Sequence, residues 1–246
     1  SGYLQEYSFL YEVIEDTDGR LLLATDKGLV ILDKVTGRAE AMVDGIAVSS
    51  LSKDPDGNIW AGGEDGLFVR PADGEAFGKV EVMISGEPLE GVIDILSDHE
   101  GRVWMTTWQK GLYMYDPSVG ETTVFKNDHL AYSYVLHQDS DNDIWVGTWG
   151  CGLLRLAEDF CTSSGYVKYD TATADGETLL DEVIYAINDV DGYILVGGQK
   201  GFSIIDRESE DTRFFAPGTS ENSLPYNQVN TILVTANGNV YLGLYE

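Results

Sequence analysis

Two tryptophans occupy positions where an aromatic ring can meet a ligand. Trp108 and Trp149 lie in the glycine-containing segments TTWQKG and GTWGCG, each between two apolar runs. Ligand sites are concentrated on loops, and aromatic rings are common in their lining. Tyr132 and Tyr134 lie at the entry to the next predicted strand, which we expect to face the same way as the two tryptophans. Side chains that form hydrogen bonds occupy equivalent segments, namely Glu64, Asp65, Gln109, Lys110, Gln199 and Lys200.

We therefore predict that these ten residues surround a ligand site in which the rings stack on a sugar. The alternative is that each tryptophan only covers the edge of a neighbouring sheet. Substitution of Trp149 by alanine separates the two interpretations, because only a ligand-binding ring can be removed without loss of folding.

Residues typical of catalysis form no recognisable motif in this chain. His99, His129 and His137 lie in different contexts, and no HExxH, GxSxG or phosphate-loop pattern is present. With 42 acidic residues, the proximity of two carboxylates carries no information. A glycosidase needs two carboxylates in different environments, which a sequence does not reveal. We expect neither catalysis by this chain nor a cofactor.

Metal binding and disulfide bonding are not expected either. The segment DSDND, 139–143, resembles the start of a calcium loop, but Trp145 and Val146 follow where such a loop needs a glycine and a later glutamate. The same acidic turn recurs elsewhere, so we predict a turn without metal. Cys151 and Cys161 form no CxxC pair, and an extended strand between them would hold the sulfurs apart.

The charge balance excludes several classes of partner. Fifteen basic and 42 acidic residues give a net charge of −27, which argues against nucleic acid and against an anionic membrane surface. No apolar run reaches the length of about 18 residues that spans a bilayer. The chain is 43% apolar, which is enough for a packed core.

The elements that position these residues recur along the chain. An acidic turn ends in Gly19, Gly57, Gly101, Asn142, Gly192 or Gly238, at spacings of 38, 44, 41, 50 and 46 residues. A strand-like run precedes each turn, and another follows it, so the two must pair as an antiparallel hairpin. Repeats of about 40–50 residues with this content are typical of a β-propeller, whose blades are four-stranded sheets.

The second strand of each repeat carries a large residue followed by small ones. The large residues are Leu22, Trp60, Trp104, Trp145, Leu195 and Tyr241. A large ring fills the wedge between neighbouring sheets, while small residues allow the next backbone to approach. We therefore assign these six positions a structural role and predict the third and fourth strands to follow, the fourth with the weakest pattern.

The pattern predicts a single all-β domain over 1–246, with five complete blades and part of a sixth. Their approximate bounds are 9–46, 47–90, 91–131, 132–181, 182–227 and 228–246. The longest interval places an enlarged outer hairpin and connection at 157–180. Because the sixth repeat stops after its second strand, we expect the chain to be a piece of a longer protein.

The repeat resembles that of the two-component regulator propeller family. DNDIWVGTWGCGLLRL and GRVWMTTWQKGLYMYDP match its pattern closely, and GTSENSLPYNQVNTI resembles its inter-blade segment. Leucine replaces tryptophan at Leu22 and Leu195, and glycine replaces threonine at Gly63 and Gly198. The resemblance implies a periplasmic sensor domain of a hybrid histidine kinase that binds a glycan fragment, as a homodimer in the intact receptor. A protein-interaction propeller and a propeller glycosidase or polysaccharide lyase are the alternatives.

Overall fold

The computed structural model describes residues 7–16, 18–156, 160, 165–171, 179–220 and 223–245. The chain is built of β-strands and divides into two compact units, Ser1–Val124 (unit 1) and Phe125–Glu246 (unit 2). In the part that is described, no helix has the length and apolar character to cross a membrane. Most of the predicted 157–180 insertion, with Cys161, lies outside the described residues, and Cys151 is a free cysteine.

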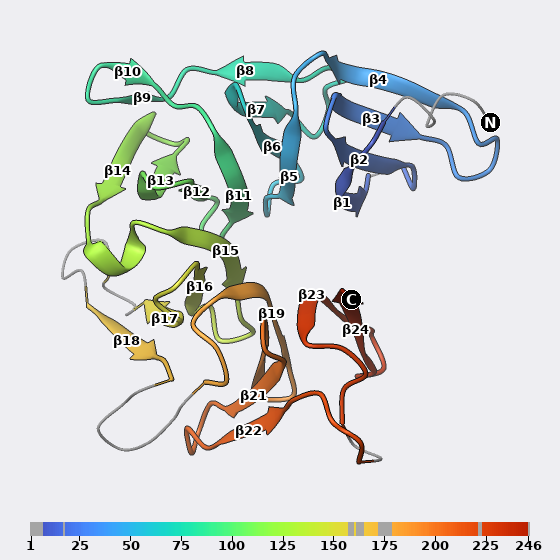
Figure 1. Cartoon of the computed structure of the whole chain (residues 1–246). Helices are drawn as coiled ribbons and strands as arrows, with labels where there is room; N and C mark the ends of the chain where they lie inside the picture. The colour runs from blue at the N-terminus through green and yellow to red at the C-terminus, as the bar shows by residue number, and fades with distance from the viewer. Residues whose placement is uncertain are drawn as a thin grey trace. The chain divides into compact units, whose positions relative to one another are not determined.

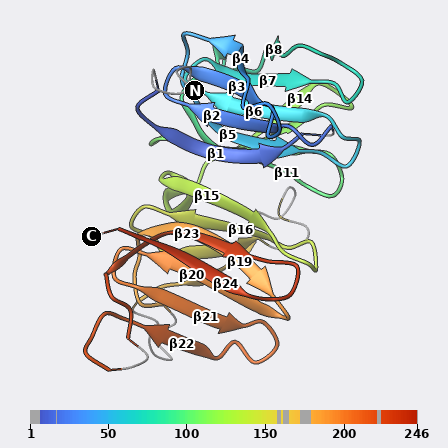
Figure 2. The same ribbon diagram turned by 90° about the vertical axis from the view of Figure 1, so that its right-hand side faces the viewer.

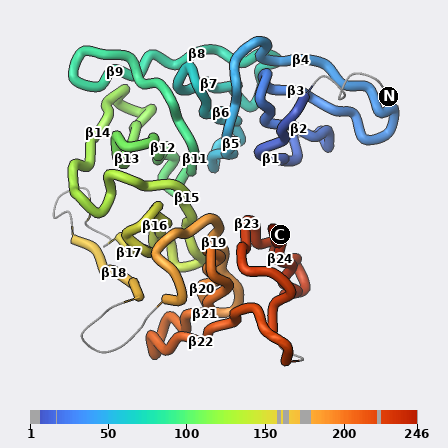
Figure 3. The backbone as a smooth tube through the Cα atoms, in the orientation of Figure 1, coloured from blue at the N-terminus to red at the C-terminus, as the bar shows by residue number. Residues whose placement is uncertain are grey.

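Unit 1 contains three four-stranded antiparallel sheets, blades 1 to 3, whose strands follow one another in sequence order. Blade 1 comprises β1 (Leu10–Glu15), β2 (Leu21–Thr25), β3 (Gly28–Leu32) and β4 (Ala39–Asp44). Blade 2 comprises β5 (Val48–Lys53), β6 (Ile59–Gly63), β7 (Gly66–Arg70) and β8 (Gly78–Val80). Blade 3 comprises β11 (Val92–Ser97), β12 (Val103–Thr107), β13 (Gly111–Asp116) and β14 (Glu121–Phe125). The chain runs outward from β1 to β4 and then returns to β5 (Figure 1, Figure 3).

Unit 2 contains blades 4 and 5, which have four strands, and blade 6, which has two. Blade 4 comprises β15 (Ser133–Gln138), β16 (Ile144–Thr148), β17 (Leu153–Leu156) and β18 (Tyr166–Tyr169). Blade 5 comprises β19 (Ile184–Val190), β20 (Tyr193–Gly198), β21 (Phe202–Asp206) and β22 (Thr212–Phe215). Blade 6 comprises β23 (Gln228–Val234) and β24 (Val240–Tyr245), and β23 packs against β19 and β20 (Figure 2). The predicted fold class is confirmed, and the single domain over 1–246 stays a prediction.

One small hairpin was not expected from the repeat. Strands β9 (Met83–Ile84) and β10 (Glu87–Pro88) form a separate two-stranded sheet after β8. Ser85 and Gly86 join them with φ of 55° and 91°, the two positive values that a tight type I′ turn requires. This hairpin and the end of β8 line a groove of about 430 Å³ at the outer edge of blade 2.

The acidic turns between first and second strands are capped by their leading aspartate. In blade 3, Asp98 Oδ1 accepts hydrogen bonds from the backbone N–H groups of Glu100 and Arg102, at 3.0 and 2.9 Å. Gly101 closes the turn with φ of 80°, and Asn142 does so in blade 4 with φ of 71°. The acidic turns of blades 3 and 4 are therefore closed by a left-handed residue, a conformation that asparagine tolerates next best after glycine.

The same aspartates also fix the tryptophans of the second strand. The indole Nε1 of Trp104 donates to Asp98 Oδ2 at 2.8 Å, and that of Trp145 donates to Asp139 Oδ2 at 2.8 Å. In blade 2, Trp60 donates to Asp54 at 2.9 Å. One carboxylate thus joins the turn backbone to the buried ring, a link that the sequence analysis did not identify.

Where leucine replaces the tryptophan, a residue of the neighbouring blade approaches the turn instead. Leu22 offers no donor, and Asp16 of blade 1 binds the buried guanidinium of Arg70 from blade 2. The turn of blade 5 is one residue shorter, because Asp189 pairs in register with Ile194 and Asp191-Gly192 form a two-residue type I′ turn. Asp189 therefore lies on the strand, where it contacts His137 of blade 4.

Small residues on the second strands allow blades to pack closely, as predicted. A Cβ atom on Gly62 would lie 2.7 Å from side-chain atoms of both Val92 and Ile95 in blade 3. A Cβ atom on Gly147 would lie 2.7 Å from Ile184 in blade 5. The large residues of blades 1 to 5 are buried, whereas Tyr241 is 57% exposed, because blade 6 is the last sheet of unit 2.

Candidate functional site

Three aromatic rings from two adjacent blades form what we call the aromatic corner, namely Trp149, Tyr134 and Tyr185. The ring centroid of Trp149 lies 5.7 Å from that of Tyr134 and 5.4 Å from that of Tyr185, with interplanar angles of 65° and 76°. The two tyrosines are 6.1 Å apart at 79°. The rings are therefore mutually close to perpendicular, the geometry that aromatic side chains favour over face-to-face stacking.

A repeated β-bulge places both tyrosines. The register of β15 shifts between Ser133 and Val135, and that of β19 shifts between Ile184 and Ala186. The unpaired residue of each bulge is Tyr134 or Tyr185, and a bulge turns its side chain away from the regular alternation. Because neighbouring blades carry the same bulge, the two rings lie at equivalent positions and meet.

The third ring is held by its backbone. Trp149 follows β16 directly; its N–H donates to Tyr132 O at 2.9 Å, and it forms an isolated antiparallel bridge with Val183. The next residue, Gly150, donates to Glu182 O at 2.8 Å. The indole itself remains 40% exposed. A fixed backbone with an accessible ring is suited to binding a ligand without rearrangement.

The remaining predicted residues of unit 2 lie close to the aromatic corner along the chain. Gln199 donates from its N–H to Val183 O at 3.3 Å, which ties the loop after β20 to the strand that pairs with Trp149. Lys200 extends its Nζ to within 3.7 Å of Asp181 Oδ1. Tyr132 is partly exposed beside the backbone of Trp149.

The other five predicted residues belong to unit 1, in the loops after β6 and β12. Trp108 is 44% exposed, and Gln109 adopts a left-handed φ of 61°. Lys110 accepts a hydrogen bond on its carbonyl from the Tyr113 hydroxyl at 2.9 Å. The backbone N–H of Glu64 donates to Ala47 O at 3.0 Å, and Asp65 lies 3.9 Å from the Lys79 ammonium. The site role of all ten residues remains a prediction.

Two residues were missed from the sequence, namely Tyr185, which belongs to the aromatic corner, and Asp181, which lies close to it. Tyr185 occupies the bulge position that Tyr134 occupies one repeat earlier, and comparison of the two repeats could have identified it. Burial raises the pKa of the Tyr185 phenol, and Tyr134 and Asp181 raise it further. The hydroxyl therefore stays protonated at neutral pH and can donate a hydrogen bond to a ligand.

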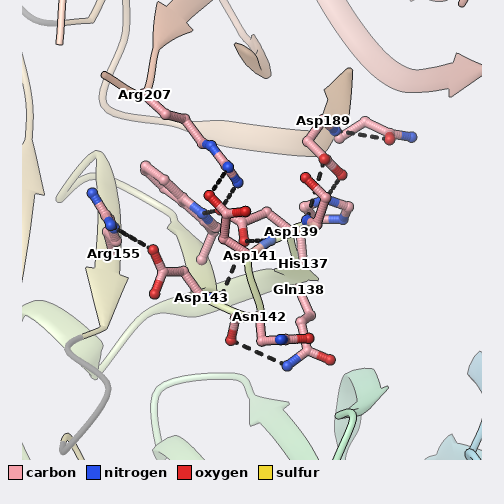
Figure 4. Close-up of polar contacts among 12 residues, drawn as sticks. His137, Gln138, Asp139, Asp141, Asn142, Asp143, Arg155, Asp189 and Arg207 are labelled. Atoms are coloured by element: carbon pink, nitrogen blue, oxygen red, sulfur yellow. Dashed lines mark hydrogen bonds and ion pairs between the residues drawn. The ribbon is translucent and has the colours of Figure 1, made fainter. Parts of the chain in front are cut away.

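A second polar cluster lies at the other end of blade 4, around the turn 139–143 that connects β15 to β16 (Figure 4). Arg207 binds Asp139 at 2.7 Å and also Asp141, while Arg155 Nε binds Asp143 at 2.7 Å. All three carboxylates of the DSDND segment thus contact arginines. No group of three or more potential ligands that could hold a metal ion occurs within the described residues.

The same cluster contains one histidine contact. His137 Nε2 lies 2.9 Å from Asp189 Oδ1, which links blade 4 to blade 5 (Figure 4). His129 Nδ1 lies 2.6 Å from the Tyr166 hydroxyl within unit 2. These contacts join blades and strands, and neither histidine lies among the residues that form the aromatic corner.

The model of the two component regulator propeller matches residues 130–150 of this chain. The resemblance inferred from the sequence is therefore confirmed, and the matched segment includes Tyr134 and Trp149, two of the three residues of the aromatic corner. Among curated proteins, none matches the sequence.

Several solved structures share the fold. The chain is similar to the extracellular domain named for hybrid two component system BT4673 from B. thetaiotaomicron, with a TM-score of 0.73 and 21% identity, over 95% of this chain and 32% of that one. The extracellular domain of BT3049 from the same organism matches with a TM-score of 0.68 and 16% identity, over 96% of this chain and 39% of that one. Virginiamycin B lyase from Staphylococcus aureus with quinupristin matches with a TM-score of 0.71 and 13% identity, over 95% of this chain and 76% of that one.

These likenesses establish the fold, a β-propeller built of four-stranded blades. The chain spans about a third of the length of the BT4673 domain.

Proposed function

We propose that this chain is a non-catalytic ligand-sensing module of an extracytoplasmic receptor, a part of a hybrid two-component sensor. The observation that carries this proposal is the aromatic corner, two of whose three rings, Tyr134 and Trp149, lie within the residues 130–150 that match the two component regulator propeller. Its rings offer apolar faces to a sugar, and its phenols and the nearby Gln199 offer hydrogen bonds. The ligand is a carbohydrate or another small polar molecule.

Signalling in this proposal follows from binding rather than from chemistry. A ligand that contacts blades 4 and 5 together stabilises their relative position, because Trp149 belongs to one and Tyr185 to the other. The intact receptor would act as a periplasmic homodimer, with its membrane span and histidine kinase in parts of the protein beyond this chain.

The test is calorimetric titration of the chain with a panel of soluble oligosaccharides. We expect one class to bind, and Trp149→Ala to abolish binding while the protein still unfolds cooperatively at a similar temperature. A matched control is Phe214→Ala, which removes a ring of similar exposure from the outer strand β22, away from the predicted site residues, and should leave binding unchanged. Loss of folding in Trp149→Ala, or binding that is unchanged by it, would contradict the assignment of the site. Capture of a protein by the wild-type chain that Trp149→Ala leaves intact would favour the interaction propeller.

Catalysis is the second candidate, because the fold is also similar to that of virginiamycin B lyase over most of both chains. A polysaccharide lyase or glycosidase would release products from a polysaccharide panel during prolonged incubation. We expect no product, and time-dependent release proportional to protein concentration would establish an enzyme.

A further inference from the structure

Asp181 is a buried carboxylate beside the aromatic corner with an unused oxygen. The residue is only 5% exposed. Its Oδ1 accepts hydrogen bonds from the backbone N–H groups of Glu182 and Val183, at 2.8 and 3.3 Å. Within the described part of the chain, no donor reaches the buried Oδ2. An unpaired buried acceptor costs about 1–3 kcal/mol, a cost that a hydrogen-bond donor reaching this oxygen would remove.

The position of Asp181 connects it to the rings. Val183, two residues later, forms the bridge with Trp149, and Tyr185 follows after one more residue. On the facing strand, a Cβ atom on Gly198 would lie 3.1 Å from Asp181 Cβ and 3.5 Å from its Oδ2. The position in blade 4 that is equivalent to Gly198 is occupied by Thr148. Because blade 5 has a glycine there, it leaves the space that the Asp181 carboxylate occupies.

The charges around the aromatic corner favour a cation. Among the described residues, Lys200 is the cationic side chain that pairs with Asp181, but its Nζ lies 3.7 Å from Asp181 Oδ1, beyond hydrogen-bond distance, and its side chain is 64% exposed. The carboxylate of Glu182, the next residue, accepts a hydrogen bond from the Thr171 hydroxyl at 2.6 Å, so Asp181 carries the local negative charge in a chain whose net charge is −27. Aromatic faces attract ammonium groups, most strongly where water is excluded. The exposed Lys200 ammonium is therefore the group that a ligand ammonium closer to Asp181 would displace.

We infer that this site binds a ligand carrying a positively charged amino group, which pairs with Asp181, contacts the aromatic corner and displaces the Lys200 ammonium. The inference rests on the proposed function, since it names the chemistry of the ligand at the same site. An amino sugar satisfies both halves of the site, because its ring stacks on the aromatic faces and its ammonium reaches the carboxylate.

The experiment compares two ligands with the same sugar backbone, one with charged amino groups and one whose nitrogens are acetylated and uncharged. The whole chain is titrated calorimetrically with a glucosamine tetramer and with its N-acetylated counterpart, in mildly acidic buffer of moderate salt where the free amines are charged. We expect the amine to bind and the acetylated tetramer to bind more weakly. Asp181→Asn should weaken amine binding by about tenfold or more, because a charge-assisted hydrogen bond is lost.

Lys200→Gln gives the sharper result, because the sign of its effect depends on ligand charge. Removal of the competing ammonium should tighten amine binding severalfold, whereas for an anionic ligand the same change would weaken it. Glu208→Gln is the control for Asp181→Asn, because it removes one negative charge from an exposed residue after β21. It corrects for general attraction to an acidic protein and should leave the affinity nearly unchanged. Cooperative unfolding of Asp181→Asn at an unaltered temperature shows that the fold is retained.

Equal affinity for the two tetramers, unchanged amine binding by Asp181→Asn, or weaker binding by Lys200→Gln would overturn the inference. If the acetylated tetramer binds equally well and Trp149→Ala abolishes this binding, the amino-group assignment fails while the proposed ligand site stands. If every bound ligand is insensitive to Trp149→Ala, the proposed site itself fails.

Discussion

Glu12 on β1 is a carboxylate that is protonated more easily in the folded chain than in the unfolded one. It accepts a hydrogen bond from the Leu51 N–H at 2.6 Å, and the neighbouring Ser50 hydroxyl donates to Asp94 at 2.8 Å. Burial, followed by the charge of Asp94, raises the pKa of Glu12 from 4.5 to about 7. Between these values the folded chain holds a proton that the unfolded chain has released. The free energy of unfolding therefore falls as pH rises through this window, by at most about 3 kcal/mol from this group.

Glu12→Gln should remove this contribution and make the chain more stable than wild type above about pH 7. Denaturant unfolding at several pH values measures the effect. Glu15→Gln is the control on the same strand, because Glu15 is exposed and pairs with Lys34 at the surface. A wild-type pH slope that Glu12→Gln leaves unaltered would show that Glu12 is not the titrating group.

Trp104 shows what the carboxylate of an acidic turn contributes at the scale of one bond. Trp104→Phe retains most of the buried ring but removes the Nε1 donor to the fully buried Asp98. We expect a loss of about 1–3 kcal/mol in the free energy of unfolding, because the acceptor is charged and shielded from water. Trp108→Phe, four residues later on an exposed ring, should change stability little. Similar losses for the two variants would mean that the indole bond contributes nothing specific.

Within one sheet, the inner and outer strands tolerate a methyl group very differently. Gly62 and Gly78 both belong to blade 2, but a Cβ atom on Gly62 would enter blade 3, whereas one on Gly78 meets nothing within 4 Å. Gly62→Ala should therefore destabilise unit 1 by about 1–3 kcal/mol, as overpacking does in other cores. Gly78→Ala should be neutral or slightly stabilising, because it restricts the unfolded chain. Thermal unfolding of the pair tests the packing, and equal melting temperatures would refute it.

At the scale of elements, the sequence predicts most strands because each repeat is a local pattern. Asp98, Gly101 and Trp104 fix a hairpin within seven residues of chain, so turn, register and burial all follow from neighbours in sequence. The hairpin β9–β10 was not predicted because it has no counterpart in the other repeats. The shorter turn of blade 5 was not predicted because its sequence, DVDG, resembles those of the other turns. Asp189 nevertheless lies one position earlier in the strand pairing than the leading aspartates of those turns.

The candidate site was less predictable because it depends on contacts between blades. The exposed position of Trp149 follows from its place after a strand, which the pattern shows. Its contact with Tyr185 depends on a bulge in the next blade, and a bulge leaves no mark on the apolar pattern. The unused oxygen of Asp181 depends on the backbone path of 181–183 and on Gly198 opposite, which only coordinates reveal.

For the molecule as a whole, net charge and exposed apolar surface act on self-association in opposite directions. A charge of −27 keeps molecules apart in dilute salt. Blades 1 and 6 nevertheless present apolar side chains to solvent, namely Phe9, Leu10, Tyr11, Leu233, Tyr241 and Tyr245. Salt screens the repulsion over about 10 Å at 0.1 M and leaves the hydrophobic attraction in place. Association should therefore increase with salt concentration.

Sedimentation velocity over a series of salt concentrations tests this expectation. The average mass should rise with salt for the wild-type chain, and Leu233→Lys should shift the rise to higher salt, because it places a charge within an exposed apolar face. Leu233 is exposed on β23, so this substitution should leave the fold intact. Val35→Lys is the matched control, since Val35 is 94% exposed in the loop between β3 and β4. If both variants associate like wild type, or if mass is independent of salt, the apolar faces of blades 1 and 6 are not the surfaces through which the molecules meet.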